Sequence, residues 1–138
     1  MRPWTRRGTL LAALCIASGL LAGPALAGSY LSRAAMLLAA GEVEASALRR
    51  RYYDKELAKA VHRLALHRVA AAREMEVPKE VVRAHPHLLL VLEAYERAAD
   101  AALRGAQEDF LVALAKARAE RSTFDSVLAQ LGWTLPKS

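Results

Sequence analysis

Four histidines are the residues whose type and spacing could carry chemistry in this chain: His62, His67, His85 and His87. In a helical hairpin that turns near Val77, residues face each other when their numbers add up to about 154, which sets His67 beside His87. His85 precedes His87 by two residues, so three imidazoles would converge, and three imidazoles suit Zn²⁺ or Cu²⁺. His67, His85 and His87 are therefore a candidate metal site, with zinc or copper as the cofactor.

The same histidines also fit a purely structural interpretation. His62 and His67 are five residues apart, which places them on different faces of a helix. Pro86 suits the first turn of a helix, so His85 and His87 would simply flank a helix start. Under this interpretation His62 and His67 lie at the edge of the core, and the protein holds no cofactor.

Basic residues concentrate between positions 49 and 73, and four of them are spaced by four: Arg51, Lys55, Lys59 and Arg63. This spacing makes a cationic stripe along one side of a helix. Such a stripe can bind an anionic partner of the cell envelope, such as lipid head groups, phosphorylated polysaccharide or an acidic protein. The alternative is a solvated face whose charge is balanced by the acidic residues between Glu74 and Asp125.

The first 27 residues have the pattern of an export signal. Arg2, Arg6 and Arg7 precede an apolar run over residues 9–22, and Ala25-Leu26-Ala27 offers the small residues at which a signal peptidase cuts. We therefore expect a signal peptide over 1–27, a mature domain over 28–138, and a periplasmic or extracellular location. The run of about 14 residues is shorter than the roughly 20 of a membrane-spanning helix, so we expect no stable transmembrane span after cleavage. Arg6-Arg7 also resembles part of a twin-arginine signal, which leaves the export route open.

Cleavage would change the charge and the cysteine content of the protein. Three of the twenty cations and none of the fourteen acids lie in the leader, so the net charge would fall from +6 to +3. Because much of the basicity would be lost, we expect no nucleic-acid partner. Cys15 also lies in the leader, so the mature chain would have no disulfide and would depend on packing for its stability.

The composition predicts an all-α fold, a compact antiparallel helical bundle of four to five helices after the signal peptide. Ala, Leu, Glu, Lys and Arg dominate, and these residues favour helices. Glycines that follow apolar-periodic stretches predict helix ends. The glycines that predict helix ends are Gly41, Gly105 and Gly132. We expect one helix over 29–40, a second from 43 to a break at Tyr52-Tyr53-Asp54, a third from that break to 75, and two more over 86–104 and 107–131.

The last of these helices has the clearest core seam, with a 4-3-4-3-4-3 spacing. Arg121 interrupts this seam, so its side chain must either extend to water or pair with Glu93 or Glu96 on the preceding helix. We expect Trp133 and Leu135 to fold back over one end of the bundle. The seam consists of Phe110, Leu114, Ala117, Arg121, Phe124, Leu128 and Leu131.

No spacing typical of a catalytic or phosphate-binding motif occurs, so the sequence predicts a non-enzymatic protein. The leading interpretation is an exported binding or structural module of the bacterial envelope that meets an anionic partner through Arg51, Lys55, Lys59 and Arg63. Two alternatives remain: a periplasmic metal-binding protein using the histidines, and a self-associating helical protein. Self-association would use Tyr52, Tyr53 and the alanine-rich segment 69–72 if they stay exposed.

Overall fold

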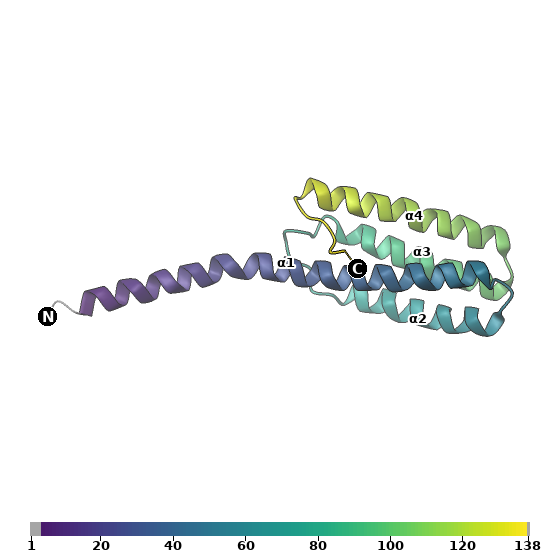
Figure 1. Cartoon of the computed structure of the whole chain (residues 1–138), viewed down its shortest axis with the longest axis horizontal. Coiled ribbons are helices and arrows are strands. Elements are labelled where there is room, and N and C mark those ends of the chain that lie inside the picture. Colours follow the sequence, from purple (N-terminus) through teal and green to yellow (C-terminus); the bar gives the residue numbers. More distant parts are fainter. Residues whose placement is uncertain (1–3, 138) are drawn as a thin grey trace.

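A computed structural model of the protein describes the backbone of residues 4–137 and the side chains of residues 25–137. This part of the chain holds four α-helices and no strand: α1 (Trp4–Arg50), α2 (Lys55–Arg73), α3 (His85–Arg104) and α4 (Gln107–Gln130). Successive helices run antiparallel, and the second half of α1 packs on α2 and α3, while its first half continues beyond the bundle as an arm (Figure 1). The predicted all-α antiparallel bundle is confirmed, with four helices.

The break between α1 and α2 lies where the sequence predicts it. Asp54 has an extended backbone, and its Oδ1 accepts a hydrogen bond of 3.0 Å from the backbone N–H of Leu57. This contact satisfies one of the free donors at the start of α2, as an N-cap does. The chain therefore reverses direction within four residues, 51–54.

Two of the three glycines end helices, as predicted. Gly105 (φ 73°) and Gly132 (φ 87°) adopt the left-handed conformation that follows α3 and α4. After α3, the backbone N–H of Ala106 donates to the carbonyl of Ala101 at 2.8 Å, and after α4 that of Trp133 donates to Leu128 at 2.8 Å. These bonds are the six-to-one contacts of a Schellman motif, which close the free carbonyls of a helix end.

Gly41 does not end a helix, and the predicted first helix over 29–40 is therefore too short. α1 continues through Gly41 to Arg50. A Cβ atom on Gly41 would lie 2.7 Å from Cδ2 of Tyr95, so the glycine allows the Tyr95 ring of α3 to approach the α1 backbone. The buried face of α1 repeats at alternating intervals of four and three, which is the spacing of a coiled-coil seam: Ala27, Leu31, Ala34, Leu38, Gly41, Ala45 and Leu48.

The core consists of two clusters, one toward each end of the bundle. α3 contacts all three other helices, and its Tyr95 packs against both clusters. Trp133 and Leu135 pack against the cluster nearest the arm, which confirms that the C-terminal segment folds back over that end. The predicted seam of α4 is buried apart from Arg121 and Leu131, which are half-buried.

Most of the predicted signal peptide, up to Pro24, lies outside the residues whose side chains are described. The backbone of α1 passes without interruption through the expected cleavage site, and Ala27 is fully buried in the bundle. Among the described residues, no helix combines the length and the apolar character needed to cross a membrane.

Candidate functional site

The histidines make separate contacts between helices. Nε2 of His62 on α2 lies 2.8 Å from a carboxylate oxygen of Glu96 on α3. Nδ1 of His87 lies 3.3 Å from a carboxylate oxygen of Glu120 on α4. A third contact joins His85 on α3 to Tyr30 on α1. The three contacts therefore connect three different pairs of helices.

His67 is exposed on α2, and the structure does not bring it to His87. The contacts His62–Glu96 and Lys55–Ala102 define the α2–α3 register, and they place His67 opposite residues near position 90, about one turn away from His87. The register differs from the predicted one because the connection over 74–84 is long and contains successive turns, closed by Val81 N–H to Pro78 and Ala84 N–H to Val81.

The expected metal site of His67, His85 and His87 is consequently not formed. Within residues 25–137, no group of three or more His, Cys, Asp or Glu side chains is arranged to hold a metal ion. His85 and His87 lie at the start of α3 and face different neighbours, which matches the structural interpretation of these residues.

The predicted cationic stripe is partly used within the molecule. Arg51 pairs with Asp54 in the α1–α2 turn. Nζ of Lys55 donates a hydrogen bond of 2.7 Å to the carbonyl of Ala102 in the last turn of α3. In the part of the chain that the structure describes, Lys59 and Arg63 are exposed and have no hydrogen bond or ion pair, so the stripe available to a partner is reduced to these two residues.

Arg121 takes the first of its two predicted options. Its Nε lies 3.3 Å from Oδ2 of Asp125, one turn along α4, and a third of the side chain is exposed. The two predicted partners on α3 are engaged elsewhere, Glu93 with Arg73 and Glu96 with His62. The stem of Arg121 thus covers the seam while its guanidinium reaches solvent.

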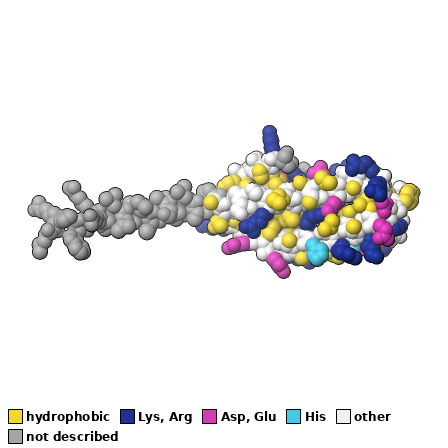
Figure 2. Space-filling view, turned by 60° about the horizontal axis from the view of Figure 1, so that its bottom comes forward, with side chains coloured by type: hydrophobic (Ala, Val, Ile, Leu, Met, Phe, Trp, Pro, Cys, Tyr) yellow, Lys and Arg dark blue, Asp and Glu magenta, His cyan; other side chains and the backbone are white. Residues whose placement is uncertain are grey.

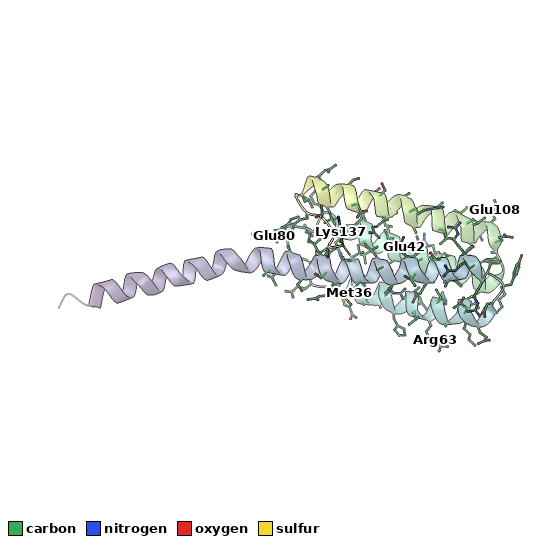
Figure 3. The ribbon with its side chains drawn as sticks, viewed as in Figure 1. Met36, Glu42, Arg63, Glu80, Glu108 and Lys137 are labelled. Atoms are coloured by element: carbon green, nitrogen blue, oxygen red, sulfur yellow. The ribbon has the colours of Figure 1, made fainter. Side chains whose placement is uncertain are left out.

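An open groove of about 680 Å³ lies between α1 and the C-terminal end of α2. Its walls are mainly apolar, and charged residues stand at the rim, Arg33 on the α1 side and Glu74 and Glu76 on the α2 side. Met36 is 72 % exposed at the edge of the groove, near the end where the arm leaves the bundle (Figure 3). The remaining lining residues are Leu37, Ala40, Ala71 and Met75.

The face of α1 that points away from α3 is also apolar. Met36, Ala40, Val43 and Ala47 follow one another at intervals of four, three and four, and Val43 is 68 % exposed. This outer seam of α1 (Met36, Ala40, Val43 and Ala47) lies on the opposite side of the helix from the buried seam. A helix that is apolar on both sides is usually buried on both sides. Figure 2 shows apolar side chains distributed over one face of the bundle among charged groups, with acidic side chains toward both of its ends.

A charged pair joins α1 to α2 farther along the two helices. Arg68 on α2 donates to a carboxylate oxygen of Glu44 on α1, and both side chains are largely buried. The second carboxylate oxygen of Glu44, Oε2, is buried without a hydrogen-bond partner. Glu44 lies one turn beyond Ala40, which lines the groove.

The surface expected to support self-association is exposed only in part. Tyr53 is 83 % exposed, but Tyr52 packs on Phe110 with ring centroids 5.1 Å apart. Val69 and Ala72 are buried against α3, whereas Ala70 and Ala71 are exposed. Of the predicted segment, only Ala71 contributes to the groove.

The outer seam of α1 could have been recognised in the sequence. The alternation of four and three from Met36 to Ala47 is as regular as that of the α4 seam, but the expectation that Gly41 ends a helix divides it in two. The groove itself could not have been predicted, because it depends on how far α2 is separated from α1.

Comparisons of the chain with protein-family models, with curated proteins and with solved structures found no match.

Proposed function

We propose that this protein is an exported, non-enzymatic binding module of the bacterial cell envelope, and that its binding surface is the α1–α2 groove together with the outer seam of α1. The leader pattern over 1–27 supports export. One observation carries the choice of surface: Met36 and Val43 expose most of their side chains on one apolar line beside an open apolar groove.

The chemistry of this surface fits an apolar or amphipathic partner. Exposed apolar patches that are rimmed by polar residues mark interaction sites, and grooves of a few hundred Å³ hold apolar ligands. Met36 and Met75 are unbranched and polarisable, so they adapt to the shape of what they contact. Arg33, Glu74 and Glu76 at the rim would orient a partner that carries charges of its own.

The proposal is tested on dilute protein, in which the groove is free of other copies of the chain, with N-phenylnaphthylamine, an uncharged probe that fluoresces in apolar sites. Met36→Arg should remove most of the fluorescence enhancement, because it places a cation at the mouth of the groove. Val112→Arg is the matched control, since Val112 is 62 % exposed on α4, away from the groove. Equal enhancement by the wild type and both variants would contradict the proposed surface.

A second candidate function, contact with anionic lipid head groups, rests on the two cations of α2 that have no partner within the described residues. Lys59 and Arg63 are one turn apart and both exposed, and Arg63 lies on the outer side of α2 (Figure 3). Binding to phosphatidylglycerol vesicles should fall with rising salt and with Lys59→Gln/Arg63→Gln. Lys116→Gln/Arg118→Gln removes the same charge from exposed positions on α4 and should bind like the wild type. Binding that is unaffected by the first pair of substitutions would exclude this function.

A further inference from the structure

We propose that the occupant of the α1–α2 groove is α1 of a second copy of this chain, and that the two copies form a dimer whose two-fold axis runs parallel to the helices. This inference rests on the proposed function and identifies its partner. It follows from the spacing of the apolar residues, from the size of the surface and from the distribution of charge at the rim.

The spacing of the outer seam is that of a helix that packs against other helices. Its intervals of four, three and four place successive side chains on one line, as a and d residues are placed in a coiled coil. On the α2 side, Ala71 and Met75 line the groove four residues apart, and Leu64 and Arg68 continue the same spacing back along α2. The outer seam of one copy can therefore insert between α1 and α2 of the other copy.

The surface approaches the size of a small specific dimer interface. α2 has 19 residues, a length of about 28 Å at 1.5 Å per residue, and two adjacent helices are about 20 Å wide. The face over α1 and α2 thus measures about 560 Å² before its relief is counted, which lies near the lower range of specific interfaces at about 600 Å² per partner. Alanines at positions 40, 47, 60 and 71 allow close approach of the two backbones.

The charges at the rim select the relative orientation of the two copies. An axis parallel to the helices exchanges the two sides of the groove, so Arg33 of each copy meets the partner's Glu74 and Glu76. An axis perpendicular to the helices would reverse α1 and bring Arg33 toward the partner's Arg50, which is also exposed. Opposite charges in the first arrangement and like charges in the second favour the parallel axis. The arm of one copy leaves the bundle at one end (Figure 1), so both arms of such a dimer would leave it at the same end.

The experiment measures the mass of the full chain by sedimentation equilibrium over a concentration series. The wild type should form dimers, and Met36→Arg should raise the dissociation constant by about tenfold or more, because a two-fold interface contains each substitution twice. Val112→Arg should dimerise like the wild type. A wild-type chain that is monomeric at all concentrations, or a dimer that Met36→Arg leaves unchanged, would overturn the inference.

Exchanging the charges at the two rims of the groove tests the direction of the two-fold axis. Recovery of dimerisation in a mixture of the variants would also show that each variant is folded. Arg33→Glu alone and Glu74→Arg/Glu76→Arg alone should each weaken dimerisation by about tenfold, since each turns the attraction between Arg33 and the two acids into repulsion on both sides of the two-fold axis. An equimolar mixture of the two variants should restore wild-type dimerisation, because both rims then pair opposite charges. A mixture that associates no better than either variant alone would overturn the parallel axis.

The probe experiment separates the two levels of the proposal. A monomer that still binds N-phenylnaphthylamine in a Met36-dependent manner would refute the second copy as the occupant and leave the groove as the binding surface. A monomer without probe binding would refute both proposals.

Discussion

The hydroxyl oxygen of Tyr30 lies 2.8 Å from Nδ1 of His85, which joins α1 to the first residue of α3. The two rings meet edge to face with centroids 5.7 Å apart. Burial lowers the pKa of His85, and a backbone hydrogen bond involving Ala72 opposes this effect. A neutral imidazole has one N–H, which is used toward Ala72, so Nδ1 accepts a hydrogen bond from the Tyr30 hydroxyl. Three helices are thereby connected through one side chain.

This connection predicts that the protein loses stability in weak acid. Because the pKa of His85 is lower in the folded state than its ordinary value of 6.5, the folded state disfavours the charged imidazole. The contribution of neutral His85 to the free energy of unfolding is complete above pH 6.5, and it is lost as the pH falls through the lowered pKa of this residue. Urea unfolding at pH 8 and pH 5 should show this loss, and His85→Gln should reduce it. His67→Gln, at an exposed histidine, should retain the wild-type pH dependence.

The contact between Gly41 and Tyr95 predicts that replacing this glycine by alanine destabilises the protein, whereas the same change within a helix usually stabilises it. Gly to Ala within a helix normally stabilises a protein by up to about 1 kcal/mol. At Gly41 the new methyl group would meet the Tyr95 ring at 2.7 and 2.9 Å, and overpacking of this kind costs about 1 to 3 kcal/mol. Gly41→Ala should therefore lower the free energy of unfolding. Combining it with Tyr95→Leu should reduce the loss, and a stabilised Gly41→Ala variant would contradict the tight contact.

Lys55 contributes to the stability of the fold, whereas the exposed Arg63 is expected to contribute little. Its ammonium donates to the carbonyl of Ala102, which also accepts a hydrogen bond of 3.2 Å from the backbone N–H of Gly105 and lies at the negative end of the α3 dipole. Lys55→Met should cost about 1 kcal/mol of unfolding free energy, as expected for the loss of one hydrogen bond. Arg63→Gln, on the same face, should change the stability by less than about 0.5 kcal/mol. Equal effects of the two substitutions in thermal unfolding would show that the Ala102 contact contributes nothing.

These residues show which features of the fold local patterns can predict. Asp54, Gly105 and Gly132 act within a few residues of themselves, so their capping roles follow from local chemistry. Gly41 has the same residue type but acts across the bundle on Tyr95, and no local pattern distinguishes the two uses. The prediction that His67 lies beside His87 was wrong for a related reason, because the register of α2 against α3 depends on the turns of a long connection. A shift of about one turn separates His67 from His87.

The buried position of Ala27 predicts the order of processing and folding. Ala27 is fully buried within a continuous helix, and proteases cut exposed, locally unfolded segments. Cleavage after Ala27 would therefore take place before the bundle forms. Intact-mass spectrometry of the protein from cells that express it should give a chain that begins at Gly28. Full-length protein that has been purified and folded should resist signal peptidase at this bond. Efficient cleavage of the folded chain would contradict this order.

The pair of Glu44 and Arg68 predicts strong coupling between α1 and α2. Both side chains are largely buried, and Oε2 of Glu44 already lacks a partner, so removal of the guanidinium would leave a buried carboxylate without compensation. Arg68→Met should lower the free energy of unfolding by about 3 kcal/mol. The double variant Glu44→Met/Arg68→Met should recover most of this loss, because two apolar side chains of similar size would replace the buried charges. A double-mutant cycle in urea measures the coupling directly. If the two single losses simply add, the pair does not couple the helices, and α1 is held to the bundle by its buried seam against α3 alone.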